Sequence, residues 1–373
     1  MRRAVLPVVA LAMPWTALAA VTPPTVSATP AQLDLTCQLG ATPPTAQITV
    51  GSVTSGLTYT ASAAASSGGS WLSLNKTAGV TPDALNILIN PAGLAAGNSY
   101  QGTVTVSGAG SAAGSSIVAV SLAVTAPPPA ISSVVNAASF LGGPLSPGEM
   151  VSIFGSNLGP AAPAGLTLDA GGKVSTILGG SQVLFNGIPA PLTYVSLSQI
   201  NCVVPYEFAQ AAGNPNVQVK SGAQTSLLFF VRQSSAAPAI FTASNGVGQG
   251  AILNADNSYN GAGPGALPAP KGSTVQIYLT GGGAANPPQA TGSVTCSSGC
   301  AAVSAIPRPA LPIAVLVNNQ PATFTFAGEA PGFVSGVLQV DVTIPPGVPS
   351  GAIPIMVLIG GVSSQAGVTV LVQ

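Results

Sequence analysis

The stretch Val118-Ala-Val-Ser-Leu-Ala-Val124 alternates large apolar side chains with small or polar ones. Such alternation is typical of a β-strand that buries one face, because successive side chains of a strand point to opposite sides. Comparable runs bounded by Gly, Pro, Ser or Asn recur at 47–50, 85–89, 103–106, 150–154, 275–279, 355–359 and 368–372. No long segment keeps the apolar period of a helix. The sequence therefore predicts an all-β protein built from β-sandwiches.

The length of the chain predicts several such sandwiches. A chain of 373 residues is too long for one core, and about 100 residues per immunoglobulin-like sandwich suggests three in an extended string. The stretch Ala126-Pro-Pro-Pro-Ala130 is the expected linker, because stacked prolines hold an extended spacer. The expected sandwiches cover residues 24–125, 131–233 and 238–373.

The two sandwiches expected after the linker repeat each other. Gly148-Glu-Met-Val-Ser-Ile-Phe-Gly155 parallels Gly272-Ser-Thr-Val-Gln-Ile-Tyr-Leu279, at an offset of 124. Two later pairs follow at offsets of 132 and 140, namely 183–190 with 315–322 and 199–205 with 339–345. An offset that grows along the chain is expected where loops are inserted between matched strands. The sequence therefore predicts two copies of one sandwich.

Several motifs after the linker resemble a known family. They are Val135-Asn-Ala-Ala-Ser-Phe140, the stretches 147–159, 191–196 and 199–207, and Ala330-Pro-Gly-Phe333 with 339–345. On these stretches, residues 131–373 resemble the Solibacter-type C-terminal module of secreted bacterial proteins. The stretch 148–159 is also similar to the opening strand of IPT/TIG immunoglobulin-like domains. This resemblance implies a fold and a secreted setting, but no activity.

Residues 24–125 resemble the BACON type of immunoglobulin-like domain. The matching stretches are Ser70-Trp-Leu-Ser-Leu74, Gly79-Val-Thr-Pro82 and 97–106. That resemblance implies carbohydrate or mucin binding, or a spacer role. Cys37 and Cys202 depart from the patterns of the two families.

Charged residues are rare in this chain, and this limits its chemistry. The sequence has 8 Lys and Arg, 8 Asp and Glu, and no His, so 4% of residues are charged where about 25% is usual. Without His, neither a Ser-His-Asp site nor a His-ligated metal can form. Without a basic surplus, nucleic-acid binding lacks its main driving force. We expect no cofactor and no enzymatic activity.

The first residues predict export. Met1-Arg-Arg3 is followed by an apolar run over 4–13 and by Ala17-Leu-Ala-Ala20, as in a signal peptide that ends near residue 20. A buried N-terminal helix is the alternative. No later stretch is an uninterrupted apolar span of about 20 residues, so we expect no membrane insertion after the signal peptide is removed. The expected location is secreted, on the cell surface or in the periplasm.

Four cysteines are expected to behave in two ways. In Cys296-Ser-Ser-Gly-Cys300 the small residues Ser-Ser-Gly allow the turn that brings the two cysteines together. We expect a disulfide between Cys296 and Cys300, because an exported protein enters an oxidising compartment. Half of a zinc site is the alternative, but it lacks two further ligands. Cys37 and Cys202 fall in different expected domains, and buried free thiols are favoured over a bridge between them.

The few carboxylates offer little for catalysis. They are Asp34, Asp83, Glu149, Asp169, Glu207, Asp256, Glu329 and Asp341. Glycoside hydrolysis needs two carboxylates about 5–9.5 Å apart. The pairs that share an expected domain are Glu149 with Glu207 and Glu329 with Asp341. Because Glu149 and Glu329 lie in Gly- and Pro-rich turns, we expect them to be solvated and to have ordinary pKa values.

A polar stretch places oxygen-bearing side chains at alternate positions. Asn254, Asp256, Ser258 and Asn260 could ring a calcium ion. However, the stretch has a single carboxylate and lacks a closing bidentate Glu. A hairpin turn rich in Asn, Asp and Gly is the favoured interpretation.

Trp71 and Tyr100 are the candidate ligand-binding residues, since exposed aromatic faces can bind sugar rings. In the strand pattern of 70–74, Trp71 points outward if Leu72 and Leu74 point inward, but a core Trp is equally compatible with the sequence. Tyr194 and Tyr206 are expected to anchor their own sandwich.

Two hypotheses of function follow from different classes. The first is a non-catalytic secreted binding or adhesion protein that recognises a glycan or an extracellular protein. The second is a structural spacer or surface-layer component without a small ligand. An exposed aromatic row would favour the first hypothesis, and apolar patches or bare sheet edges would favour the second.

Overall fold

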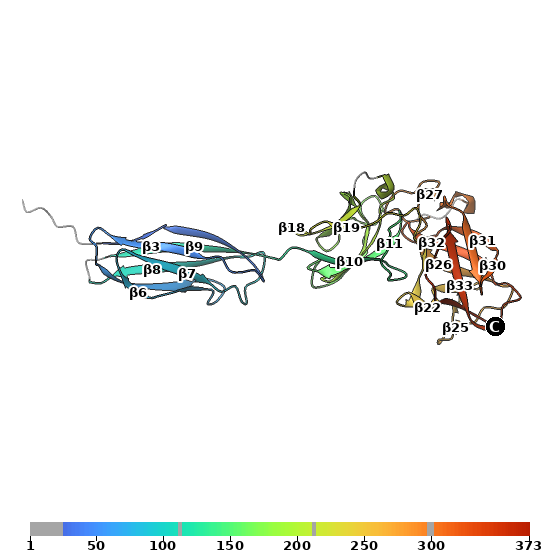
Figure 1. The fold of residues 1–373 in the computed structure, drawn as a ribbon, viewed down its shortest axis with the longest axis horizontal. Coiled ribbons are helices and arrows are strands. Elements are labelled where there is room, and N and C mark those ends of the chain that lie inside the picture. The colour runs from blue at the N-terminus through green and yellow to red at the C-terminus, as the bar shows by residue number, and fades with distance from the viewer. Residues whose placement is uncertain (1–24, 111–113, 211–213, 297–301) are drawn as a thin grey trace, which may run out of the picture. The chain divides into compact units, whose positions relative to one another are not determined.

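The computed structural model describes residues 25–110, 114–210, 214–296 and 302–373. In these ranges nearly all regular structure is β-strand, and the helical elements are two short 3-10 turns, η1 (Tyr206–Gln210) and η2 (Val303–Ala305) (Figure 1). The prediction of tandem all-β sandwiches is confirmed, and each of the eight runs expected to be strands lies within a strand. The chain divides into two compact units, residues 1–127 and 128–373. The predicted signal peptide lies outside the described residues.

The first unit is a two-sheet sandwich. One sheet has the strand order β1 (Val26–Thr29), β3 (Ala46–Ser52), β7 (Asp83–Ile89) and β5 (Leu72–Leu74). The other has the order β2 (Gln32–Gln38), β9 (Ser115–Thr125), β8 (Ser99–Gly108), β4 (Thr58–Ala65) and β6 (Ala78–Val80). On β9 the alternate residues from Val118 to Val124 are buried, so the predicted face of this strand forms part of the core.

The second unit begins with a sandwich formed by residues 130–230. One of its sheets has the order β10 (Ala130–Asn136), β11 (Met150–Ser156), β16 (Gln199–Val203), β15 (Leu192–Val195) and β12 (Ala164–Gly165). The other contains β14 (Ile188–Pro189), β13 (Ser181–Phe185), β17 (Asn216–Ser221), β18 (Gln224–Thr225) and β19 (Phe229–Phe230). Phe185 and Phe208 meet edge to face in its core, with ring centroids 5.6 Å apart.

A second, larger sandwich completes this unit. Its first sheet contains β25 (Ala266–Leu267), β24 (Tyr259–Asn260), β23 (Ile252–Asn254), β26 (Thr274–Thr280), β32 (Val337–Thr343), β31 (Phe324–Glu329) and β20 (Ala239–Ile240). Its second sheet contains β21 (Thr242–Ser244), β22 (Val247–Gly250), β35 (Val368–Val372), β33 (Gly351–Ile359), β29 (Ile313–Val317), β30 (Gln320–Ala322) and β34 (Val362–Ser363). A separate pair is formed by β27 (Ala285–Asn286) and β28 (Arg308–Pro309).

The strand registers confirm the internal repeat. In the first copy Ile153 on β11 pairs with Ile200 on β16, and in the second copy Ile277 on β26 pairs with Val340 on β32. These positions differ by 124 and 140 residues, which are the offsets found in the sequence. The hairpins β13–β14 and β29–β30 match in the same way. The sequence repeat therefore marks equivalent strand pairs.

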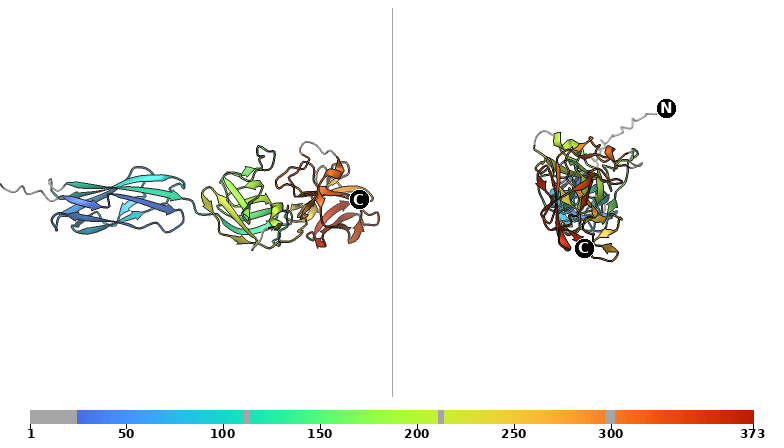
Figure 2. Two further views of the ribbon diagram at one scale, coloured as in Figure 1. Left: turned by 90° about the horizontal axis from the view of Figure 1, so that it is seen from above. Right: turned by 90° about the vertical axis from the view of Figure 1, so that its right-hand side faces the viewer.

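The two sandwiches of the second unit pack against each other at a contact that we call the junction (Figure 2). Its apolar part is a cluster of Val174 and Val203 from the first sandwich with Ala330, Val334 and Val337 from the second. Hydrogen bonds cross the junction as well: the Val174 amide donates to the Gly292 carbonyl at 2.8 Å, and the Met150 amide donates to Thr280 Oγ1 at 2.8 Å. Shared apolar burial and satisfied backbone groups therefore join the two sandwiches.

Gly336 makes the closest backbone approach across the junction. Its φ is +104°, and a Cβ atom there would overlap the carbonyl oxygen of Gly148. We expect Gly336→Ala to destabilise the second unit by about 1–3 kcal/mol more than Gly272→Ala, because Gly272 also has a positive φ but faces open space. Urea denaturation followed by circular dichroism measures the difference. Equal losses of stability would show that the close approach is unimportant.

Candidate functional site

The structure places the predicted aromatic pair away from any exposed platform. Trp71 is 1% exposed, and its Nε1 donates to the Ser67 carbonyl at 2.8 Å inside the core of the first unit. The alternation expected from residues 70–74 fails because β5 begins at Leu72, so that Trp71 and Leu72 are both buried. A surface stacking role for Trp71 is therefore wrong.

Tyr100 supports a loop of the first unit. It is half-buried, and its hydroxyl oxygen accepts from the Ala95 amide at 2.9 Å. Its ring lies so close to Gly68 that a side chain at that position would overlap it. Because Trp71 is buried, the predicted pair of Trp71 and Tyr100 does not form an exposed platform for a sugar ring.

We expect Trp71→Ala to lower the stability of the first unit by about 3–5 kcal/mol, because it leaves a large cavity in a packed core. The expected effect on ligand binding by the folded protein is none. A thermal melt and a binding assay on the same preparation test both statements. Lost binding at unchanged stability would contradict the buried position.

The calcium candidate forms a hydrogen-bonded hairpin turn between β23 and β24. Asn254 Oδ1 accepts from Asn260 Nδ2 at 3.0 Å, and Asn260 Oδ1 accepts from the Leu371 amide at 2.8 Å. Asp256 Oδ1 accepts from the Ser258 amide at 3.0 Å. These oxygens already have partners within the protein, so the arrangement supports the turn that the sequence favoured.

The cysteines are distributed as follows. Cys37 and Cys202 are buried free thiols in different units, as the sequence analysis favoured. Burial raises the pKa of the Cys202 thiol, which makes this thiol unreactive. Cys300 lies outside the described residues, so the disulfide between Cys296 and Cys300 stays a prediction.

Glu149 lies in the junction, contrary to the expectation of a solvated turn residue. It is 1% exposed. Its Oε1 accepts from Asn136 Nδ2 at 2.9 Å, and its Oε2 accepts from the Ser146 amide at 2.8 Å. The same Asn136 Nδ2 also donates to the Ala237 carbonyl at 3.2 Å, which links this carboxyl to the second sandwich.

Glu329 is the second buried carboxyl of the junction. It is 2% exposed on β31. The Tyr206 hydroxyl from η1 of the first sandwich donates to its Oε1 at 2.8 Å, and the Gly336 amide donates to its Oε2 at 2.7 Å. The hydroxyl of Tyr206 therefore connects the two sandwiches, whereas the sequence predicted that Tyr206 anchors its own sandwich. The sequence predicted solvated glutamates because the contact of Tyr206 with Glu329, and the link through Asn136 from Glu149 to Ala237, join residues that are far apart in the chain.

Burial changes the acidity of these groups. Desolvation raises the pKa of Glu149 to about 8, although the hydrogen bonds from Ser146 and Asn136 oppose the shift. Desolvation likewise raises the pKa of Glu329 to about 7, against the hydrogen bonds from Gly336 and Tyr206. The expectation of ordinary pKa values is therefore wrong for both residues.

An open groove of about 720 Å³ is the candidate binding site. It lies beside the junction, and both sandwiches of the second unit line it. We call it the aromatic groove. Its aromatic side chains are Phe241, Tyr259, Tyr278 and Phe333. Met150, Leu166 and Thr193 from the first sandwich form part of the opposite wall.

Two of the aromatic rings are placed for contact with a ligand. Phe333 is 48% exposed at the end of the turn Ala330-Pro-Gly-Phe333, where Gly332 has a φ of +81°. Its ring is tilted by 44° from that of Tyr278, and the centroids are 5.7 Å apart. Tyr259 is 73% exposed on β24. Exposed aromatic faces of this size at one groove are typical of a binding surface.

The polar groups at the groove are uncharged. Asn257 and Thr193 line it, and no Lys, Arg, Asp or Glu is among its lining residues. Asn257 Oδ1 accepts from Gln276 Nε2 at 3.3 Å, and the Tyr278 hydroxyl donates to Gln276 Oε1 at 3.2 Å. These contacts orient the polar edge of the groove with neutral donors and acceptors.

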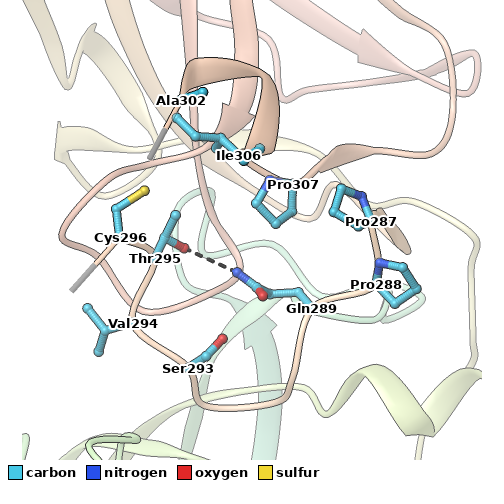
Figure 3. A pocket seen from close by; sticks show the side chains of 11 residues that line it. Pro287, Pro288, Gln289, Ser293, Val294, Thr295, Cys296, Ala302, Ile306 and Pro307 are labelled. Atoms are coloured by element: carbon cyan, nitrogen blue, oxygen red, sulfur yellow. Dashed lines mark hydrogen bonds between the residues drawn. The ribbon is translucent and has the colours of Figure 1, made fainter. Parts of the chain in front are cut away.

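A smaller pocket of about 320 Å³ lies in the same unit (Figure 3). Its wall includes Pro287, Pro288 and Pro307, and Gln289 Nε2 donates to Thr295 Oγ1 at 3.5 Å. Its lining residues Cys296 and Ala302 border residues 297–301, which the structure does not describe. No binding site is assigned to this pocket.

Comparison with known proteins gives one family match. The IPT/TIG domain model matches residues 129–231. No curated protein matches the sequence. Among the described residues, no helix is long and apolar enough to span a membrane.

Solved structures similar to this chain include three with different roles. The SGBP-B protein of the Bacteroides ovatus mixed-linkage glucan utilization locus, in complex with a mixed-linkage heptasaccharide, is 14% identical, with 95% of this chain and 69% of that chain covered and a TM-score of 0.27. The Escherichia coli adhesin FdeC is 13% identical, with 94% and 96% covered and a TM-score of 0.20. Mouse cadherin-23 EC22-24 is 11% identical, with 94% and 99% covered and a TM-score of 0.24. At these TM-scores the similarities say nothing about what this chain binds.

Proposed function

We propose that this chain is a non-catalytic extracellular binding protein whose aromatic groove binds a neutral oligosaccharide. The observation that supports this most directly is the set of four aromatic side chains on an open groove lined without charge. The apolar faces of sugar rings pack on aromatic rings, and the amide and hydroxyl groups at the edge can bond to sugar hydroxyls.

The absence of charge in the lining favours a neutral ligand over an acidic one. A uronate, sulfate or sialate in this groove would lose water without meeting a cation, and burying an unpaired charge is costly. A neutral sugar loses only hydroxyl hydration, which Asn257 and Thr193 can partly replace.

The carboxyls are not arranged for glycoside hydrolysis at this groove. Glu149 and Glu329 are fully engaged in the junction, and neither lines the groove. The arrangement therefore supports binding without turnover. The predicted signal peptide and the low charge favour a place outside the cytoplasm, either secreted or on the surface.

A glycan array probed with the mature full-length chain tests the proposal. We expect binding to neutral oligosaccharides and none to their sulfated or uronate-bearing counterparts. Binding confined to acidic glycans, or binding to none, would contradict it.

A structural or assembly role is the second candidate. Leu227, Leu228 and Phe230 are exposed together beside β19, and Leu227 is 90% exposed. An apolar group of this kind favours contact with another protein surface. Analytical ultracentrifugation tests this role: concentration-dependent association that Leu227→Ser abolishes would support it, and a monomer at all concentrations would exclude it.

A further inference from the structure

The two buried glutamates lie in the contact that holds the groove together. Glu329 from the second sandwich accepts from Tyr206 of the first, and Asn136 of the first joins Glu149 to the Ala237 carbonyl of the second. Loss of either carboxyl contact therefore weakens the link between the two sandwiches, and not only the packing within one of them.

The same contact continues directly into the walls of the groove. Met150 follows Glu149 in the chain and lines the groove, and its amide donates to Thr280 Oγ1 at 2.8 Å. Thr280 Oγ1 in turn donates to the Gly336 carbonyl at 2.7 Å, and the Gly336 amide donates to Glu329. Val337, the next residue, lines the opposite wall. A short hydrogen-bonded chain thus joins Glu329 to both walls.

Among the residues that the structure describes, no Lys or Arg forms an ion pair with either glutamate. Within the described ranges the ion pair is between Lys76 and Asp83, in the first unit. On the elements around Glu149, the other titratable groups include the buried thiol of Cys202, the exposed Arg232 and Tyr206, whose ring lies against Gly148. The other titratable groups around Glu329 already have partners of their own. The guanidinium of Arg308 lies over the Phe326 ring, 5.6 Å from its centroid. Asp341 accepts a hydrogen bond from Gln339, Tyr278 donates one to Gln276, and the exposed Glu207 accepts one from Thr291.

We propose that the junction is a proton-controlled latch on the aromatic groove: protonated Glu149 and Glu329 hold the two sandwiches together, and ionisation of both loosens the junction and opens the groove. This inference rests on the proposed function for its ligand, but the latch itself does not depend on a ligand. Burial without a counter-ion favours the neutral carboxyl, so the latch is closed in acid and at neutral pH and weakens in alkali.

The ligand-free test is amide hydrogen exchange of the full-length mature chain at pH 6, 7.5 and 9, corrected for the intrinsic effect of pH on exchange. The wild type is expected to lose protection at Met150 and Val337 by about tenfold or more between pH 6 and pH 9. The variant with both Glu149→Gln and Glu329→Gln keeps neutral side chains and should show no such loss. Asp169→Asn, which removes an exposed carboxylate of the same unit, is the control and should behave as the wild type.

Isothermal titration then links the latch to binding. The probes are cellohexaose, laminarihexaose, xylohexaose and maltohexaose, and the tightest binder should lose about tenfold or more in affinity from pH 6 to pH 9 in the wild type alone. If the double variant does not fold, Tyr206→Phe, which removes a hydrogen bond that lowers the pKa of Glu329, should shift the loss of protection to higher pH. Protection that is independent of pH in the wild type, or equally dependent in the double variant, overturns the latch. Binding to none of the four probes with pH-dependent protection intact counts against the proposed function and leaves the latch supported.

Discussion

Phe333→Ala is expected to weaken oligosaccharide binding by about thirtyfold, or roughly 2 kcal/mol, with little change in stability. The ring is half exposed at the tip of a turn, so that its removal takes little apolar area from the core. In a complex the same ring would be covered by the ligand, next to the tilted ring of Tyr278. Isothermal titration at constant pH measures the affinity, and a thermal melt measures the stability.

Phe324→Ala is the matched control for this substitution. Phe324 is 38% exposed on β31 and is not among the residues that line the groove. Its removal should leave the affinity unchanged within about twofold. Equal losses for the two variants, or no loss for Phe333→Ala, would show that the ligand binds elsewhere.

The second large effect is a fall in the stability of the second unit as the pH rises. The pKa values of about 8 for Glu149 and about 7 for Glu329 are above the ordinary value of 4.5, so the folded state binds these protons more tightly than the unfolded state. The stabilisation is therefore complete below about pH 4.5, decreases as the pH rises, and is lost above about pH 8. Together the two groups should change the free energy of unfolding by several kcal/mol.

The first unit should respond in the opposite direction. The hydrogen bond from Lys76, and then that from Tyr59, lower the pKa of Asp83 to about 2, so the stabilisation by this group is present above about pH 4 and is lost in strong acid. Urea denaturation at about pH 2, 5, 7 and 9 separates the two trends, because the first unit should lose stability in acid and the second unit in alkali. With both Glu149→Gln and Glu329→Gln the alkaline loss should disappear, and with Asp169→Asn it should remain. A second unit that gains stability between pH 5 and pH 9 would refute the assignment.

Much of the fold follows from local sequence pattern. The alternation over 118–124 identifies β9, and the offsets of 124 and 140 match the paired strands of the two copies residue for residue. The first signal comes from neighbouring positions in the chain, and the second comes from comparing two short stretches of the sequence directly. Period-two burial and turn residues at strand ends are local properties, so the sequence alone is enough to identify them.

The groove could not be predicted in this way because its residues are far apart in the sequence. Met150 and Tyr278 lie on strands, Phe241 lies between β20 and β21, and Phe333 follows a turn, and none of them stands in an unusual local pattern. One signal was available: the turn Ala330-Pro-Gly-Phe333 ends on a large aromatic residue, and turns usually lie at the surface. The sequence instead offered Trp71 as a ligand-binding residue, but β5 begins at Leu72 and Trp71 is buried.

The two glutamates show the same limit in electrostatic terms. Gly- and Pro-rich surroundings predict solvated carboxylates when each turn is considered alone. In the structure the turn at Gly148 meets Gly336 across the junction, and both glutamates are buried. The shift in the pKa of each glutamate therefore depends on the packing of the two sandwiches against each other. A short stretch of sequence does not contain this information.

The most direct test of oligosaccharide binding in the aromatic groove is the footprint of the bound ligand, measured by amide hydrogen exchange. The full-length mature chain is compared with and without a neutral glycan taken from the array. We expect added protection in residues 150–166, 251–259, 276–278 and 332–337, which contribute to the aromatic groove, and none in residues 25–110. Protection confined to the first unit, or spread without reference to the groove, would contradict the claim that the aromatic groove is the binding surface.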